Sequence, residues 1–486
     1  MDNMFSNTIS PIDNRYFNKI EEINNFFSYK SWVNYRLNVE TNYLILLLKT
    51  LNDNNEFIIN NYLDDNITGE FIENLSSKLN KNILSFSDEN LKEILDIEKK
   101  TLHDIKAIEY YLKSILTNDT IIDICNDLNV NVDKQNKILK QITEYIHFGL
   151  TSQDVNSVAF TLQIMGCMSY VLIPNMKKIF DNLESLSTNS NITIMAYTHG
   201  QPAVPTNMMK ELKVFIHRLK YWYTDIEKHE HHTKFGGAVG NLNAHYYTYP
   251  NINWEDTFAK YLKDEGINKW KYTTQITNYD DICKLFGYMI GFNNVLVDFC
   301  QDIWLYISRN YFKLHKENKD QVGSSTMPQK VNPIDFENAE GNLKLANSGF
   351  HFFIDKLQVS RLQRDLTDST ILRSVGTYFC YSLLAYKNII RGIKKLEINK
   401  KEIENDLNNH PEILSEAIQT ILRKYNIPNG YDLIRKITQN KDYKNLEDFK
   451  SEIMIELTNY IANPEDRNEI EKLIRNLDFN SYSGKF

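Results

Sequence analysis

The sequence predicts an all-α protein built around a bundle of long helices. Proline is absent from positions 12–173, 251–327 and 334–410, and since proline interrupts helix interiors, these windows permit long helices. Between positions 281 and 312, apolar residues recur at intervals of three and four, which is the helical period. A helix of this length would span about 48 Å. Its apolar stripe is wide, so we expect burial among several partner helices.

Composition and charge narrow the possible classes of protein. A chain of 486 residues allows roughly three domains of about 150 residues each. With 42% apolar and 24% charged residues, the chain buries a large core, which excludes a mostly disordered protein. The net charge of −8 argues against a general nucleic-acid binder.

Cysteine usage and the N-terminal sequence indicate the compartment. The five cysteines are few, odd in number and far apart, without a CxxC pair, so we expect buried reduced thiols and a cytoplasmic protein. No basic stretch followed by an apolar run opens the chain, so no signal peptide is predicted. The densest early apolar run, 44–48, is far shorter than the roughly 20 residues of a bilayer crossing. We expect a soluble protein without a membrane partner.

Glycine and proline gather at three connections, 198–205, 236–241 and 323–333, where helices must start, stop or bend. The last reads GSSTMPQKVNP. Its glycine leaves backbone amides open to an anion, and Ser324, Ser325, Lys330 and Asn332 follow within ten residues. Together they could surround a small carboxylate. The alternative is an ordinary loop whose serines cap the next helix.

Three histidines and one arginine-rich segment could also carry chemistry. His199, before Gly200, lies where a helix cannot continue, and an imidazole suits proton donation to a leaving group. His103 and His147 lie in polar segments of apolar surroundings, and a structural role is the alternative for all three.

The segment 360–373 contains Arg361, Arg364 and Arg373, whose planar guanidinium groups match phosphate. On a helix, Arg364, Asp368 and Ser369 would share one side. A salt-bridged surface helix is the alternative.

Two further patterns do not predict a site. The histidines of KHEHH, 228–232, lack the i, i+4 spacing of zinc ligands on a helix, so we predict no metal there. GGAVGN, 236–241, resembles a phosphate-binding glycine loop, but it lacks the preceding strand and the Lys-Ser/Thr ending.

The motifs resemble a known family. GSSTMPQKVNP matches every fixed position of the signature GSSxMPxKxNP of the fumarase/aspartase superfamily of lyases. Further segments are similar to the adenylosuccinate lyase family in the same order: DNRYF, LHDIKAIEY, HFGLTSQD, THGQPAVP, GAVGNLNAH, YTTQI and QRDLTDSTILR. The resemblance covers nearly the whole chain.

The resemblance implies three helical domains, at 1–140, 141–393 and 394–486, and a homotetramer whose core is the central long-helix bundle. It implies active sites shared by three subunits, a purine nucleotide substrate and no cofactor or metal. The implied reaction is cleavage of adenylosuccinate to AMP and fumarate, together with the equivalent cleavage of the succinylaminoimidazole carboxamide ribotide.

The same resemblance implies roles for single residues. His199 would be the general acid, Ser324 the general base with Ser325 as the alternative, Lys330 a stabiliser of the developing charge, and His147 a support for the acid. Contacts to the phosphate and nucleotide are implied for Arg15, Tyr16, His103, Asp104, Arg364, Ser369 and Arg373. Contacts to the succinyl end and adjoining groups are implied for Thr151, Ser152, Gln275, Lys330, Asn332 and Asn338.

Other functions are compatible with some of these motifs. Argininosuccinate lyase and fumarase share the signature but bind no phosphate, and the RY pair with QRDLTDSTILR favours the nucleotide substrate. A non-catalytic helical scaffold would be free to lose His199, Ser324 or Lys330, and the chain keeps all three.

Overall fold

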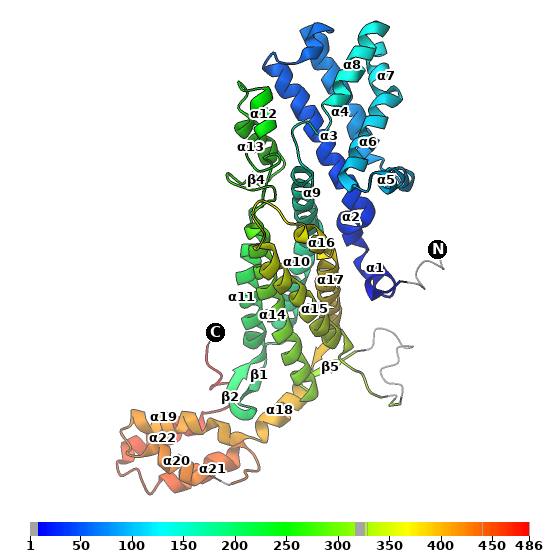
Figure 1. Ribbon diagram of the computed structural model, residues 1–486. Coiled ribbons are helices and arrows are strands. Elements are labelled where there is room, and N and C mark those ends of the chain that lie inside the picture. The colour runs from blue at the N-terminus through cyan, green and yellow to red at the C-terminus, as the bar shows by residue number, and fades with distance from the viewer. Residues whose placement is uncertain (1–7, 316–325, 328, 440, 486) are drawn as a thin grey trace. The chain divides into compact units, whose positions relative to one another are not determined.

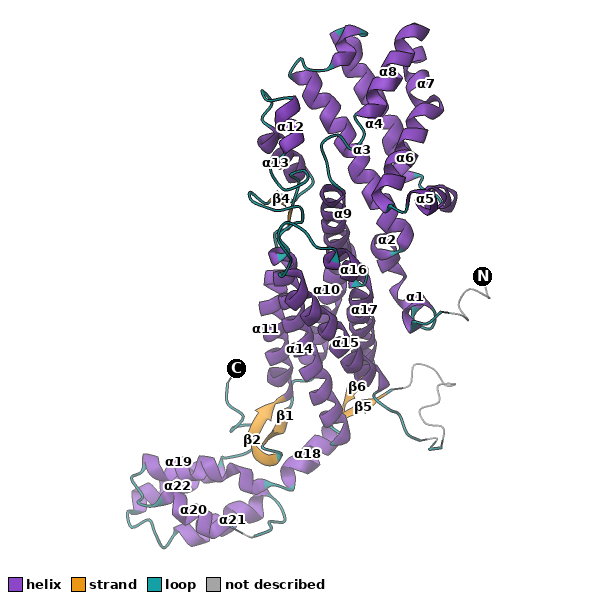
Figure 2. Cartoon of the chain, viewed as in Figure 1, coloured by secondary structure: helices purple, strands orange, loops and turns teal. Residues whose placement is uncertain are grey.

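The computed structural model describes residues 8–315, 326–327, 329–439 and 441–485. Helices dominate it, and the strands form only short two-stranded pairs in the described part of the chain (Figures 1 and 2). The all-α prediction is confirmed.

The helices lie in succession along the chain, with a few short 3-10 and π turns between them. They are α1 Phe17–Ile20, α2 Asn24–Phe27, α3 Tyr29–Asp53, α4 Asp65–Leu84, α5 Asp88–Thr101, α6 Asp104–Ile115, α7 Ile121–Asp127, α8 Val132–Glu144, α9 Ser152–Cys167, α10 Ile173–Asn189, α11 Met208–Glu227, α12 Asn243–Thr248, α13 Trp254–Asp264, α14 Asp280–Ser308, α15 Ile334–Leu357, α16 Thr367–Leu372, α17 Val375–Lys394, α18 Lys400–Asn408, α19 Ser415–Lys424, α20 Gly430–Thr438, α21 Leu446–Leu457 and α22 Pro464–Arg475. The strands are β1 Thr193–Thr198, β2 Gln201–Asn207, β3 His232–Thr233, β4 Asn268–Lys269, β5 Phe312–Leu314 and β6 Leu396–Ile398.

The chain divides into two compact units that share several long helices. Unit 1 comprises residues 1–175, 224–291 and 345–384, and unit 2 comprises residues 176–223, 292–344 and 385–486. The division into three domains along the sequence stays a prediction.

Helix α3 forms the centre of unit 1. Its apolar residues Tyr43, Leu44, Leu47 and Leu48 are fully buried, and α4, α6 and α9 pack against it. Burying such side chains stabilises the fold by about 1.5–3 kcal/mol each. This core fixes the positions from which α3, α6 and α9 present polar residues.

The predicted helix at 281–312 exists but ends four residues earlier, since α14 covers Asp280–Ser308. Asn310 adopts a left-handed backbone conformation (φ 59°), and the amide of Tyr311 donates to the carbonyl of Tyr306, which closes the last turn. The chain then continues as β5, which pairs antiparallel with β6.

The five cysteines are buried and free, as predicted. The helical stretch Ser152–Asn189 is long and apolar enough to span a bilayer by length and composition, and 61% of its most apolar window is buried inside the protein. Burial of that kind is typical of a core helix.

Candidate active site

Unit 1 contains a polar cavity of about 500 Å³. It is lined by residues of α3, of the first turns of α6 and α9, and of the segment leading into α16. Eight residues selected from the sequence line it: His103, Asp104, Thr151, Ser152, Gln275, Arg364, Ser369 and Arg373. Segments separated by more than 250 residues therefore converge on one cavity.

Three arginines give the cavity its positive charge. Asp104 lies between two of them, with Oδ2 at 3.3 Å from Arg36 Nη1 and 3.7 Å from Arg373 Nη2. Arg36 is only 5% exposed, and its guanidinium lies 4.7 Å from the centre of the Trp32 ring. Burial lowers the pKa of Arg36 to about 10, against the attraction of Asp104, and it remains charged at neutral pH.

Arg36 was missed by the sequence analysis. The available signal was an arginine among the apolar positions of a helix, between Val33 and Leu37. Burying a charge there destabilises the fold unless the charge is paired or binds a ligand.

Arg364 is held in place by the polar groups around it. Its Nη2 donates to the Ser369 hydroxyl at 3.1 Å, and Nη1 lies 3.7 Å from Asp368. With its amide oxygen turned toward Arg364, Gln153 accepts from Nη2 at 2.9 Å. Arg364, Asp368 and Ser369 thus lie together, as expected. Arg364 nevertheless precedes the helix, since α16 begins at Thr367, whose amide donates to the carboxylate of Asp365 at 2.8 Å.

Two helix starts supply further polar groups. His103 caps α6, and its Nδ1 accepts from the amide of Lys106 at 3.1 Å. With Nδ1 accepting this bond, the ring carries its proton on Nε2. Thr151 precedes α9, whose first turn brings Ser152 and Gln153 to the cavity. The positive end of the α9 dipole adds to the attraction for an anion.

The glycine-rich segment 236–241 has a structural role. The amides of Gly236 and Gly237 donate to Asp154 Oδ1, at 2.7 and 3.1 Å, and the fully buried Lys234 pairs with the same oxygen at 2.7 Å. A side chain at Gly240 would meet the carbonyl oxygen of Thr273 at 2.2 Å. The prediction that this segment is no nucleotide-binding loop agrees with these contacts.

Gln275 is tied to the same segment. Its side-chain amide donates to the Ala238 carbonyl at 3.0 Å, and its backbone amide donates to the Gln363 carbonyl at 3.2 Å. The glycine segment thereby holds one wall of the cavity next to Arg364.

His147 is not among the residues that line the cavity. Its Nδ1 lies 2.6 Å from Oε1 of the buried Glu40, and Nε2 lies 3.8 Å from Glu109. Burial lowers the pKa of His147, but the charge and hydrogen bond of Glu40 outweigh burial, so the pKa is raised overall. Glu40 was also missed, and the available signal was a glutamate among the apolar positions of a helix, between Leu37 and Leu44.

The remaining predicted residues of unit 1 lie outside the cavity lining. Arg15 is exposed, and Tyr16 precedes α1.

Unit 2 carries His199, Lys330, Asn332 and Asn338. His199 and Gly200 form the two-residue turn of the β1–β2 hairpin, with φ of 55° and 74°, a turn suited to the strand twist. Tyr197 donates to Asp406 at 2.7 Å and so holds the hairpin in place. The turn that carries the exposed His199 side chain is therefore fixed.

Lys330 is exposed, whereas Asn338 lies on α15 and accepts from Asn342 and Asn388. Ser324 and Ser325 lie outside the described residues.

The fold, together with family matches, defines the class of protein. A family model described as lyase matches residues 15–346, and one described as the adenylosuccinate lyase C-terminal region matches residues 360–480. The chain is similar in structure to a fumarate lyase from Mesorhizobium sp. BNC1, with a TM-score of 0.67 at 14% identity over 94% of this chain and 95% of that one. At that identity the likeness concerns the fold. The protein is an enzyme of the lyase class.

Sequence relatives narrow the class to one family. An adenylosuccinate lyase of Legionella pneumophila (strain Corby) is 41% identical over 91% of both chains. Another, of Dictyostelium discoideum, is 40% identical over 96% of this chain and 94% of its own. The chain belongs to the adenylosuccinate lyase family, as the sequence motifs indicated.

Proposed function

We propose that this enzyme cleaves adenylosuccinate to AMP and fumarate, and the succinylaminoimidazole carboxamide ribotide to its carboxamide and fumarate. The observation that carries the proposal is the cavity of unit 1, in which Arg36, Arg364 and Arg373 surround a space large enough for a nucleotide phosphate. The names of the relatives agree with this substrate.

The phosphate end of the substrate binds at these arginines. Arg364 and Arg373 donate to phosphate oxygens in pairs, and the Ser369 hydroxyl and the His103 Nε2 proton add further donors. Asp104 lines the same cavity, where it holds Arg36 and Arg373. Arg15 and Tyr16 complete the nucleotide contacts.

Breaking the C–N bond requires a base and an acid on opposite sides of the substrate. Loss of the proton beside a carboxylate places a second negative charge on that group, and Lys330 and Asn332 stabilise it together with Thr151, Ser152, Gln275 and Asn338. In this proposal Ser324, with Ser325 as the alternative, removes the proton. His199 protonates the leaving nitrogen.

His147 supports the acid by holding a proton in its pair with Glu40. Such a pair orients the imidazole and favours its charged form. No step of the elimination calls on a metal, a hydride or an electron sink, so we propose no cofactor.

The proposed site includes residues of more than one copy of the chain. We propose a cytoplasmic homotetramer in which three subunits contribute to each site, so that His199 and the signature segment of other copies complete the cavity. The proposal involves no nucleic acid and no membrane.

A turnover panel tests this function. The full chain is incubated separately with adenylosuccinate, the succinylaminoimidazole carboxamide ribotide, argininosuccinate and fumarate, while purine absorbance and fumarate are followed. We expect turnover of the first two. Turnover of argininosuccinate, or hydration of fumarate, without cleavage of adenylosuccinate would contradict the proposal.

A further inference from the structure

The histidines of the KHEHH segment lie in a part of unit 1 that the lyase reaction does not use. Helix α11 ends at Glu227, and the chain then runs through non-helical backbone into β3 at His232. In extended backbone, residues two apart point to the same side, so His229 and His231 can face one partner. The helical spacing that the sequence analysis required does not apply here.

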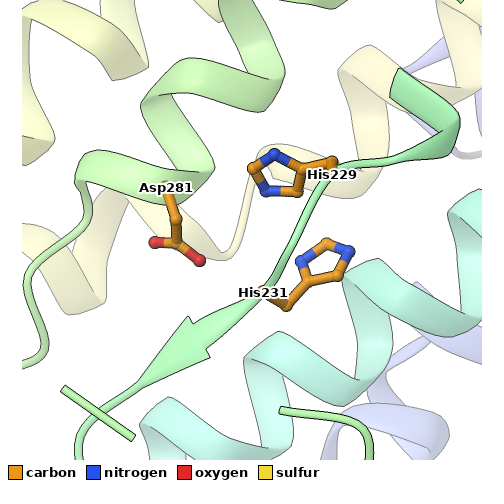
Figure 3. A group of neighbouring side chains, drawn as sticks. All are labelled: His229, His231 and Asp281. Atoms are coloured by element: carbon orange, nitrogen blue, oxygen red, sulfur yellow. The ribbon is translucent and has the colours of Figure 1, made fainter. Parts of the chain in front are cut away.

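Their partner is Asp281, in the first turn of α14. Figure 3 shows His229, His231 and Asp281 facing a common space, the histidines from the segment before β3 and the aspartate from the helix. One ligand atom of each residue lies within 4.8 Å of those of the other two. All three belong to unit 1.

This cluster leaves polar atoms without partners. Asp281 is 6% exposed, and its Oδ2 accepts from the amide of His232 at 2.8 Å. Its Oδ1, together with His229 Nε2 and His231 Nδ1, is buried without a hydrogen-bond partner among the described residues. Buried polar atoms in that state are uncommon, because each loses its hydration without replacement.

Burial shifts the pKa of all three side chains toward the neutral form. Burial lowers the pKa of His229 to about 3 and that of His231 to about 4, so both rings are neutral at pH 7 and keep a free lone pair. Burial raises the pKa of Asp281 to about 7. The other charged side chains that line the adjoining cavity are three carboxylates, of Asp225, Glu230 and Asp280, and two ammonium groups, of Lys228 and Lys284.

We propose that His229, His231 and Asp281 bind a Zn²⁺ ion. Two imidazoles and a carboxylate are a frequent ligand set for zinc, with a fourth position left for water. An adjoining cavity of about 390 Å³, lined by His229 and Asp281 among others, has room for that water.

Zinc–ligand bonds of about 2.0–2.1 Å place tetrahedral ligand atoms about 3.3 Å apart, so rotations of the side chains draw the three together. The bound ion joins the segment after α11 to the start of α14, a structural role separate from the elimination.

Zinc binding to the full-length protein tests the site. The purified chain is stripped with a chelator, desalted and titrated with Zn²⁺ against a chromophoric competitor, and bound metal is measured by mass spectrometry. We expect one zinc ion per chain and, with Co²⁺ instead, the visible absorption of a four-coordinate site. His229→Ala, His231→Ala and Asp281→Asn should each weaken binding by at least about a hundredfold, since even changes around metal ligands cost about 10- to 100-fold.

His232→Ala is the matched control. This neighbouring histidine lines the same cavity, but its ring stacks on Trp270 with centroids 4.4 Å apart, and it is no ligand in the proposal. It should retain wild-type affinity. Circular dichroism and gel filtration of the metal-free variants show whether a variant that binds zinc weakly is still folded. The Co²⁺ spectrum of the wild-type chain tests the site without any substitution. Absence of stoichiometric zinc in the wild-type chain, uptake that survives all three substitutions, or an equal loss in His232→Ala would each overturn the proposal.

Discussion

Replacing Arg36 by methionine should separate ligand binding from stability. In the ligand-free protein the Arg36 charge destabilises the folded state, because burial lowers the pKa of Arg36 from 12.5 to about 10 even with Asp104 beside it. A shift of that size means that the folded state disfavours the charge by about 3 kcal/mol, at 1.36 kcal/mol per pKa unit. The group stays charged below pH 10, so the cost is present throughout the neutral range.

Methionine preserves the apolar stem and removes the charge. We expect Arg36→Met to leave the free energy of unfolding unchanged or to raise it by about 1–3 kcal/mol, as happens when buried charges are replaced by apolar groups. Binding should move in the opposite direction. Loss of a charge-assisted contact of about 1.5–3 kcal/mol predicts a KM for adenylosuccinate roughly 10- to 150-fold higher.

The assay combines urea unfolding of the ligand-free protein with steady-state kinetics. Arg475→Met is the control, since this arginine is exposed on α22 and pairs only with Glu471 among the described residues. It should change stability by less than about 0.5 kcal/mol and leave KM unchanged. A destabilised Arg36→Met variant with a normal KM would show that Arg36 is a structural residue and not part of the anion site.

Two other predictions concern stability. Gly240→Ala should destabilise the protein by about 2–4 kcal/mol, because the left-handed backbone (φ 87°) disfavours a side chain and the new carbon would meet Thr273; an unchanged urea midpoint would contradict the structural role of the glycine segment. For Asp281→Asn, measured in the presence of a chelator, the sign follows from the raised pKa of about 7: protonated Asp281 contributes stability that is complete below about pH 4 and is lost as the pH rises through 7. The free energy of unfolding of the asparagine variant should therefore rise, relative to that of the wild type, by about 3 kcal/mol between pH 4.5 and 7.5, and saturating Zn²⁺ should reverse the order. A constant difference in thermal midpoint across this pH range would contradict the burial argument.

The sequence was sufficient for the fold class and for much of the cavity. Long proline-free windows and the helical period are local features, so α14 could be placed to within a few residues of its observed bounds. Residues such as His103 and Arg373 were selected by their resemblance to family motifs, and the fold brings them to one cavity.

Other features depend on contacts that no local pattern encodes. The apolar neighbours of Arg36 mark it as unusual, but they do not show that it meets Asp104, and Gln153 looks like an ordinary polar residue of a helix. The packing of α3 and α9 brings these two residues to Asp104 and Arg364. The segment 198–205 lies between helices α10 and α11, as expected, but the hairpin that it forms was not predicted. Its two prolines belong to β2, an edge strand that tolerates them. The roles of His199, Ser324 and Lys330 stay predictions.

A thermodynamic cycle can test whether the arginines of unit 1 hold the substrate phosphate. The value of kcat/KM is measured for adenylosuccinate and for its dephosphorylated nucleoside, with wild-type enzyme and with Arg373→Met. If Arg373 contacts the phosphate, removing the phosphate should cost the wild-type enzyme at least about tenfold more than it costs the variant. Equal costs in the two enzymes would contradict this contact.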